Sequence, residues 1–360
     1  MNKALIKKLI SDIRFWIILF FALRLLGITN APLEFGHNWR QSLTNMIARN
    51  FFENDANLFY PSIDLAGEKS GIIGSEFPFY NYLIYILSYI FDYSHWLGRL
   101  VNLFVSSFGL YYFYKLIKDL ISNSVAFNAT IVLTVSIWFA FSRKIMPDTF
   151  SVSIVIIGLY YAYDFFKNGL KSSLIKFFVF STLGMLCKIP ALSLFSVLSI
   201  SIFIKEINLR RKIELYLVGT FGFLIVCLWY FYWVPYLVET FHYQLYFTKG
   251  IVEGIHEITP LIPELLEKFY FSALQSYIAL ICFFAGIILI IKNNHKYIMY
   301  GVGVIFSVFL LFIMKTGAVF PLHNYYIIPF TPIMALMAGY AINQIPLKFQ
   351  YMLLILIAIE

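Results

Sequence analysis

Apolar segments long enough for transmembrane helices recur along the whole chain of 360 residues. Residues 15–23, 151–163 and 216–232 contain no charged side chain. A helix needs about 20 apolar residues to cross the hydrocarbon core of a bilayer. The first such segment, 13–29, is followed by ten more. The pattern predicts an all-α polytopic membrane protein with about 11–12 transmembrane helices.

Composition supports this interpretation. Hydrophobic residues make up 61% of the chain and charged residues 13%, and the mean hydropathy is +0.79. Soluble domains carry roughly 25% charged residues. We assign most of the net charge of +8 to cytoplasmic loops, because no nucleic-acid-binding motif is present. Cys187, Cys227 and Cys282 lie in or beside apolar segments, so no disulfide framework is expected.

Basic loops predict the orientation. Loops 205–212 and 292–296 are rich in Lys and Arg and are expected in the cytoplasm, as is the N-terminus. The first outer loop, 30–75, and the second, 236–270, then lie outside. We predict a single transmembrane domain over residues 1–360. The last apolar run ends at Glu360, too early for a full span, so either the chain is truncated at its C-terminus or this helix ends within the bilayer.

Two stretches strain this topology. Segment 77–91 has about 15 residues against the roughly 20 that a span needs. It is either re-entrant or interfacial, or it spans and a later assignment is wrong. The suspect for such an error is 172–204, which is interrupted at Lys188-Ile189-Pro190.

The first outer loop contains an amphipathic pattern. Leu43, Met46, Ile47 and Phe51 share one face of a helix predicted over 42–52. Such a helix lies on the outer membrane surface or packs on its own bundle; the two alternatives do not exclude each other.

Two acids stand beside apolar segments on the predicted outer side. Glu76 precedes an apolar stretch, where a partly desolvated carboxylate is a candidate base or metal ligand. Its alternative role is that of a helix N-terminal acid. Asp148, in Ser142-Arg143-Lys144-Ile145-Met146-Pro147-Asp148, is a candidate catalytic acid or a helix cap.

Several cations lie on the same side. Arg143 and Lys144 sit outside, against the positive-inside bias, which suits a lipid phosphate; an ion pair is the alternative. Lys188 is a lone cation in an apolar stretch and binds phosphate or snorkels to the interface. His323 opens a late apolar segment, where a structural role is the alternative.

Together these pieces resemble the GT-C glycosyltransferases that use polyprenyl-phosphate sugars, in the branch of protein O-mannosyltransferases and the lipid A aminoarabinose transferase. The resemblance covers about residues 15 to 340. The matching residues, in order, are Trp39-Arg40-Gln41, Ala48-Arg49-Asn50-Phe51, Glu76-Phe77-Pro78-Phe79-Tyr80, Arg99-Leu100, Ser142-Arg143 with Pro147-Asp148-Thr149, Lys188-Ile189-Pro190 and His323-Asn324-Tyr325-Tyr326.

The resemblance implies a bundle of about a dozen helices with a cavity open to the outside. It also implies an acidic pair before the surface helix, where this chain has Arg40-Gln41 instead; Glu34 and His37 are the nearest replacements. The family's other two outer acids correspond to Glu76 and Asp148.

The implied reaction transfers a sugar from a polyprenyl-phosphate donor to a glycan, lipid or protein acceptor, with inversion at the anomeric carbon. A base must remove the acceptor proton, and cations must stabilise the leaving phosphate. No cofactor is required, although a divalent metal at Glu76 and His323 stays open. The catalytic candidates are Asp148, Glu76, His37 and Glu34. The candidates for binding the lipid phosphate are Arg40, Arg143, Lys144, Lys188, His323 and Tyr325.

This hypothesis predicts that alanine at Arg143 abolishes transfer in a folded protein. It places the protein in a bacterial inner membrane, with the active site extracytoplasmic. Two alternatives remain open: a polysaccharide polymerase or ligase using a diphosphate-linked donor, and a lipid-sugar flippase or transporter. The chain shows no internal repeat of the kind transporters often carry.

Overall fold

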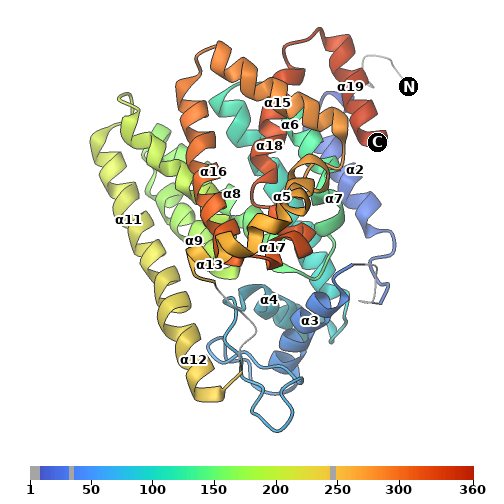
Figure 1. Cartoon of the computed structure of the whole chain (residues 1–360), viewed down its shortest axis with the longest axis vertical. Coiled ribbons are helices and arrows are strands. Elements are labelled where there is room, and N and C mark those ends of the chain that lie inside the picture. The colour runs from blue at the N-terminus through green and yellow to red at the C-terminus, as the bar shows by residue number, and fades with distance from the viewer. Residues whose placement is uncertain (1–8, 32–35, 244–248) are drawn as a thin grey trace.

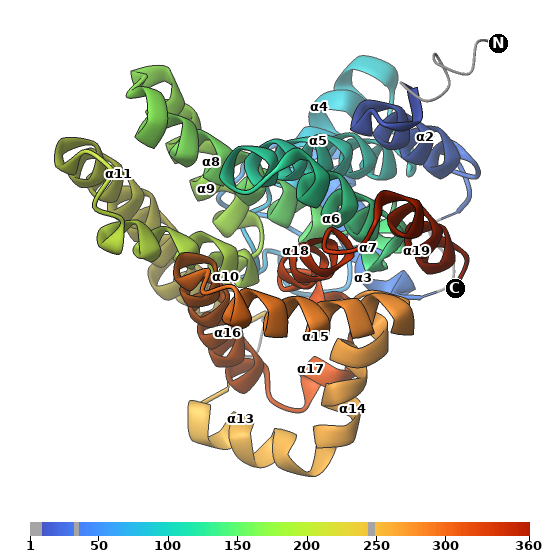
Figure 2. The ribbon, with the colours of Figure 1, turned by 90° about the horizontal axis from the view of Figure 1, so that it is seen from above.

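The computed structural model describes residues 9–31, 36–243 and 249–360. These residues form helices joined by loops, with one isolated antiparallel bridge between Ser62 and Ile72 (Figures 1 and 2). The α-helices are α2 (Ile13–Leu25), α3 (Asn38–Glu53), α4 (Phe79–Phe91), α5 (Leu97–Leu120), α6 (Asn123–Val135), α7 (Ile137–Phe141), α8 (Pro147–Asn168), α9 (Lys171–Cys187), α10 (Leu192–Phe195), α11 (Leu209–Leu228), α12 (Val234–Phe241), α13 (Ile251–Ile258), α14 (Ile262–Glu267), α15 (Tyr277–Lys292), α16 (Lys296–Thr316), α17 (Val319–Leu322), α18 (Thr331–Ile342) and α19 (Leu347–Ile359). The all-α fold predicted from the sequence is confirmed.

Shorter helical segments connect several of these helices. Two of them, η3 and η5, are π-helical turns, and the others are 3₁₀-helical. They are η1 (Ile189–Ala191), η2 (Ser196–Phe203), η3 (Trp229–Trp233), η4 (Thr259–Leu261), η5 (Lys268–Ser272) and η6 (Asn324–Ile327).

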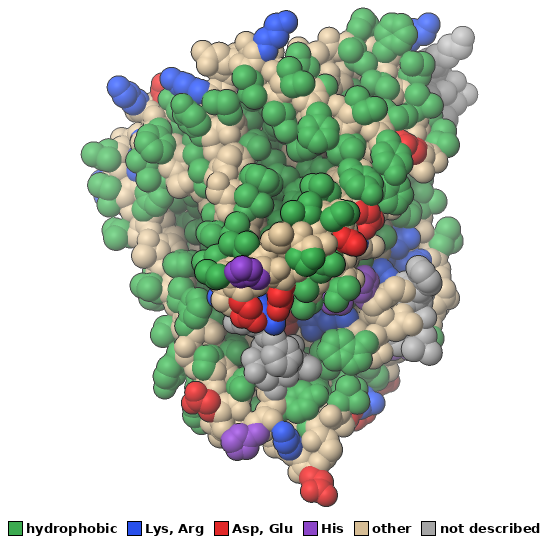
Figure 3. Space-filling model, viewed as in Figure 1, with side chains coloured by type: hydrophobic (Ala, Val, Ile, Leu, Met, Phe, Trp, Pro, Cys, Tyr) green, Lys and Arg blue, Asp and Glu red, His purple; other side chains and the backbone are tan. Residues whose placement is uncertain are grey.

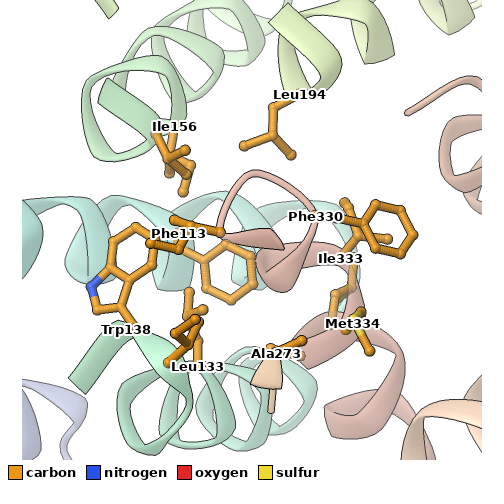
Figure 4. Close-up of a cluster of buried hydrophobic side chains, with 14 of the residues drawn as sticks. Phe113, Leu133, Trp138, Ile156, Leu194, Ala273, Phe330, Ile333 and Met334 are labelled. Atoms are coloured by element: carbon orange, nitrogen blue, oxygen red, sulfur yellow. The ribbon is translucent and has the colours of Figure 1, made fainter. Parts of the chain in front are cut away.

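Mostly apolar side chains fill the centre of the bundle, around helix α18. Every residue of α18 is buried, and α18 packs between α6 and α15. Close packing is possible because Gly339 has no side chain: a Cβ there would lie 2.4 Å from the backbone nitrogen of Ala129. Figure 4 shows the core they share, with Phe113 of α5, Trp138 of α7 and Met334 of α18 among the buried side chains.

Four helical stretches of the described residues are long and apolar enough to cross a membrane: Leu97–Leu120, Pro147–Asn168, Leu209–Phe241 and Lys296–Thr316. Ile251–Ser272 and Tyr277–Lys292, bent by 96°, would together make a fifth. Shorter apolar helices of 10–17 residues also occur in the described part of the chain. Much of the surface between the two ends is accordingly apolar, as Figure 3 shows.

Helix α4 does not cross from one face of the bundle to the other. Near its start, Asn81 donates to the carbonyl of Thr44 in α3 at 2.8 Å. Just beyond its end, Tyr93 stacks on Phe52 of α3, and Asn45 of α3 donates to the carbonyl of His95. Both ends of α4 therefore meet α3, which favours the non-spanning alternative for this segment.

Helix α3 begins four residues before the predicted start and packs on its own bundle. Leu43, Ile47 and Phe51 are buried against Ile63 and Ile73 of the loop that follows. The apolar face that the sequence predicted thus closes a small core within the first loop. The polar connection 54–75 then leads to Glu76.

The helix in the stretch 172–204 breaks at Lys188, as the sequence indicates. Helix α9 ends at Cys187, Lys188 is extended with φ −160°, and a 3₁₀ turn begins at Ile189 with Pro190 as its second residue. Pro190 lacks the N–H that a continuing α-helix requires, and its ring would clash with the carbonyl of the preceding turn. The break leaves the Lys188 side chain inside the bundle.

Candidate active site

Glu76 accepts hydrogen bonds from two cations on the same carboxylate oxygen. Arg40 Nη2 lies 2.6 Å and Lys188 Nζ 2.5 Å from Oε1. Arg40 comes from the first turn of α3, Glu76 from the loop before α4, and Lys188 from the break after α9. Three segments that are far apart in the sequence therefore meet at one atom.

The backbone around Glu76 is held on both sides. The indole Nε1 of Trp229 donates to the carbonyl of Ser75 at 3.0 Å, and the N–H of Phe77 donates to the carbonyl of Leu186 at 3.1 Å. The rings of Phe77 and Trp229 also meet edge to face, with centroids 4.9 Å apart. These contacts position Glu76 beside Lys188, whose own segment begins at the end of α9.

Asp148 is a second carboxylate close to Lys188. It stands in the first turn of α8, with Oδ1 3.9 Å from Lys188 Nζ, and its side chain is 4% exposed. Its second oxygen, Oδ2, is buried and accepts no hydrogen bond. Lys188, itself 8% exposed, therefore lies close to two carboxylates, with the shorter contact to Glu76.

For Glu76 and Lys188, attraction outweighs the cost of burial, whereas burial raises the pKa of Asp148 above its ordinary value despite Lys188 and Arg40. Burial by itself would raise the pKa of Glu76, but Arg40 and Lys188 hold that pKa well below its usual range. Burial would likewise lower the pKa of Lys188, but Glu76 and Asp148 raise it. In the ionised state the two cations balance the two carboxylates. A buried set of charges persists only when it is paired in this way.

A cavity of about 170 Å³ opens beside this cluster. Arg40, Glu76 and Lys188 line it, whereas Asp148 does not. Its remaining walls come from the start of α3, the π-turn after α11, the end of α16 and the segment after α17. The other lining residues are Trp39, Leu43, Ser75, Ile189, Pro190, Tyr230, Phe312, Lys315, Thr316, Val319, His323, Tyr325 and Tyr326.

Two histidines and a tyrosine form an aromatic cluster next to the cations. The ring centroid of Tyr325 lies 4.8 Å from that of His37 and 5.1 Å from that of His323, and Lys188 Nζ lies 5.9 Å from the Tyr325 ring. Burial and the nearby His323, Lys144 and Lys268 lower the pKa of His37 to about 4. His323 has its pKa lowered as well, by burial and then by Lys188 and Arg40. Both histidines are thus neutral at pH 7.

Arg143 and Lys144 do not line the cavity. Lys144 Nζ donates to the carbonyl of Gly36 at 2.9 Å, and the guanidinium of Arg143 donates to the carbonyl of Leu26. The amide of Asn102 in turn binds the carbonyl of Lys144 at 2.8 Å. Lys144 thus ties the first loop, and Arg143 the end of α2, to the connection between α7 and α8. In this structure Arg143 is placed to position the end of α2, and its effect on transfer stays a prediction.

Other predicted residues fall in different places. Glu34 lies outside the described residues. Lys315 lines the cavity, although sequence reasoning gave it no role. The sequence feature that singled out Lys188 also applies to Lys315: each is a lysine on the predicted outer side, at the end of an apolar run.

A divalent metal at Glu76 and His323 stays a prediction. No group of three or more His, Cys, Asp or Glu side chains that could hold a metal ion occurs in the described part of the chain. Oε1 of Glu76 is already engaged by two cations, which would repel a divalent ion. Anion binding suits this arrangement better.

Comparison with known proteins agrees with this picture. Residues 75–233 match the family model described as dolichyl-phosphate-mannose-protein mannosyltransferase. ArnT from Cupriavidus metallidurans matches in the apo state and bound to undecaprenyl phosphate, each at 12% identity and TM-score 0.64, over 94% and 96% of this chain and 62% and 63% of that one. An oligosaccharyltransferase from Archaeoglobus fulgidus matches at 11% identity and TM-score 0.58, over 95% of this chain and 51% of that one. No curated protein matches the sequence.

The chain has the GT-C fold. The resemblance predicted from the sequence is thereby confirmed for the fold, and the chain is a multi-pass membrane protein. It spans less than two thirds of the length of the ArnT chains that it matches. Within the GT-C fold, the segment matched by the family model contains Glu76, Asp148 and Lys188, while Arg40 and His323 lie outside it.

Proposed function

We propose that this protein is a membrane glycosyltransferase that moves a sugar from a polyprenyl-phosphate donor to an acceptor hydroxyl. The observation that carries the proposal is the convergence of Arg40 and Lys188 on one anionic point in the wall of a cavity. Charge-assisted hydrogen bonds from Arg and Lys are among the strongest contacts available to a phosphate. Two matched structures support a donor of this class: ArnT with undecaprenyl phosphate, and the archaeal oligosaccharyltransferase AglB from Archaeoglobus fulgidus with an inhibitory peptide and a dolichol-phosphate.

The proposed chemistry uses side chains alone. Arg40 and Lys188 stabilise the negative charge that develops on the leaving lipid phosphate. A carboxylate removes the proton of the acceptor hydroxyl. Glu76 is the better placed of the two candidates, because it lines the cavity and Asp148 does not. We assign Asp148 to keeping Lys188 charged and oriented, at 3.9 Å. No metal ion takes part in this scheme.

The remaining lining residues suit a sugar. Tyr325 and His323 stack with an interplanar angle of 25°, and aromatic faces of this kind cover the apolar faces of pyranose rings. His37, with its lowered pKa, is a weak base and is assigned to packing against Tyr325. The acceptor, a glycan, lipid or protein, would approach through the cavity mouth. We propose a bacterial inner membrane as the location, with the site extracytoplasmic and the N-terminus cytoplasmic.

Transfer from a radiolabelled undecaprenyl-phosphate hexose, in membranes supplied with a native acceptor extract, tests the proposal. We expect the wild type to move label to a second molecule, and Arg40→Gln to lose about a hundredfold or more of this rate. Arg49→Gln is the matched control, because it removes the same charge from the same helix at a half-buried position outside the cavity.

Two results would contradict the proposal. One is the absence of transfer from any of several monophosphate donors by folded wild-type protein. Transfer from a diphosphate-linked oligosaccharide would then indicate a polymerase or ligase, and movement of the lipid without bond cleavage would indicate a flippase. The other is equal loss of activity in Arg40→Gln and Arg49→Gln, because the role of Arg40 would then be general and not tied to the cavity.

A further inference from the structure

Two of the cations that line the cavity, Arg40 and Lys188, share one anionic partner. Arg40 Nη2 and Lys188 Nζ both bind Oε1 of Glu76, at 2.6 and 2.5 Å. Oε1 therefore stands where an oxygen of an incoming phosphate would make its strongest contacts. A phosphate held by both cations cannot share that position with the carboxylate, because two anions at contact distance repel each other.

We propose that Glu76 is a built-in stand-in for the donor's phosphate, which the lipid phosphate displaces from Arg40 and Lys188, and that the released carboxylate is then the base of the reaction. This inference rests on the proposed function and adds to it the order of events at the site. In the empty site Glu76 keeps two buried cations paired. In the loaded site those cations belong to the donor.

The surrounding structure allows this exchange without a movement of the main chain. The backbone beside Glu76 is tied by Trp229 and Leu186, so the exchange is confined to side chains. Arg40 and Lys188 have long flexible side chains that can follow the phosphate. Lys188 keeps a second carboxylate nearby throughout, because Asp148 Oδ1 lies 3.9 Å from its Nζ.

Release changes the basicity of Glu76 in the required direction. Burial raises the pKa of this carboxyl, and only Arg40 and Lys188 hold it low. A carboxylate with a strongly lowered pKa is a poor proton acceptor. Once the phosphate has taken the two cations, burial dominates and Glu76 becomes a stronger base. The base is therefore weak in the empty site and strengthened when the donor is bound.

The reaction then balances in charge. The acceptor oxygen forms a bond to the anomeric carbon, and the bond from that carbon to the phosphate oxygen breaks, with its electron pair staying on the phosphate. The acceptor proton goes to Glu76. The donor phosphodiester carries one negative charge and the product lipid phosphate carries two, while Glu76 loses one. Arg40 and Lys188 thus leave Glu76, whose negative charge is lost, and hold the lipid phosphate, whose negative charge increases.

Binding of undecaprenyl phosphate to the purified full-length protein in nanodiscs tests the exchange, with undecaprenol as the probe that lacks phosphate. Glu76→Gln removes the competing anion, so we expect it to bind undecaprenyl phosphate about tenfold more tightly than the wild type. The same variant should lose about a hundredfold or more of its transfer rate. Affinity for undecaprenol should not change. Glu68→Gln, an acid on the exposed part of the first loop, is the matched control and should leave both quantities unchanged.

A second pair of variants covers a failure of Glu76→Gln to fold, because that change leaves two buried cations without their acid. The double variant Arg40→Gln/Glu76→Gln removes one charge of each sign. Compared with Arg40→Gln alone, it should bind undecaprenyl phosphate more tightly, because Lys188 is released. Weaker or equal binding in both comparisons would overturn the inference and make Glu76 a residue that only holds the cations in place.

These measurements separate the inference from the proposed function. If the wild type does not prefer undecaprenyl phosphate to undecaprenol, the proposed function itself fails. If that preference and wild-type transfer are present but loss of Glu76 does not tighten binding, only the stand-in role fails.

Discussion

The basic residues singled out from the sequence differ in where the fold places their side chains. A lone lysine in an apolar segment is either a snorkelling side chain or a functional one. In the structure Lys188 does not snorkel, because its Nζ turns inward to Glu76 and its side chain is almost fully buried. Its functional role stays a prediction. Arg143 behaves differently. It was a candidate for binding the lipid phosphate on the outer side, but its guanidinium donates to the carbonyl of Leu26 and it does not line the cavity.

The pKa of His37 leads to a prediction at this scale. The folded-state pKa of about 4 lies below the ordinary value of 6.5. Between these two pH values His37 is protonated in the unfolded chain and neutral in the folded protein. The stability contributed by a neutral His37 is present above pH 6.5 and is lost progressively as pH falls from 6.5 towards 4. We expect the melting temperature to fall over this range, and to fall less in His37→Gln. Identical pH profiles for the two proteins would contradict this assignment.

The elements that build the cavity owe their positions to close packing as much as to charge. Helix α13 lies against the end of α16, where Lys315 and Thr316 line the cavity. Two contacts secure it: Glu257 of α13 accepts from the N–H of Ala318 at 3.0 Å, and the N–H of Lys249, just before α13, donates to the carbonyl of Lys315 at 3.0 Å. Movement of α13 would therefore disturb the cavity wall.

Gly254 lies where α13 touches α16, and it gives a test at the scale of elements. A Cβ at this position would come within 1.6 Å of the carbonyl oxygen of Met314, which belongs to the backbone and cannot turn aside. We expect Gly254→Ala to destabilise the protein by about 1–3 kcal/mol, measured by thermal unfolding in detergent, and to reduce transfer.

The control is Gly303→Ala in α16, where a Cβ meets nothing within 4 Å. That change should be neutral or slightly stabilising, because alanine favours a helix over glycine by about 1 kcal/mol. Equal melting temperatures for the two variants would show that α13 is not docked as closely as the structure indicates.

At the scale of the whole molecule, the residues of the candidate site lie towards one end of an apolar bundle. Helices α3 and α4, with the loop between them, gather at the lower end in Figure 1, whereas the connection between α15 and α16 lies at the upper end. The wide apolar surface between the two ends in Figure 3 matches the part that a bilayer would cover. The proposed orientation puts the lower end outside the cell.

Cysteine labelling checks this orientation. In a background without Cys187, Cys227 and Cys282, we expect Glu68→Cys to react with a membrane-impermeant maleimide added from the extracytoplasmic side. Lys292→Cys should react only after the membrane is made permeable. Both positions are exposed in the structure. The reverse pattern would show that the positive-inside assignment is wrong, and labelling of both from one side would show that the two ends do not face opposite compartments.

The sequence by itself determined which segments are helices, which loops are polar and where the chain breaks. Apolar periodicity revealed α3 with its buried Leu43, Ile47 and Phe51, and the Lys188-Ile189-Pro190 motif revealed the end of α9. These features follow from short-range rules: the apolar length needed to cross a bilayer, helical periodicity and the stereochemistry of proline.

Only the tertiary structure decided which polar side chains meet. Glu76 and Lys188 are separated by 112 residues, and Arg40 and Glu76 by 36, yet all three touch at one oxygen. Arg143, chosen from the same type of evidence, lies elsewhere. The reason is physical: hydropathy reports how each segment meets the membrane, whereas the contact of two side chains depends on how the helices between them pack and on which face each helix turns inward.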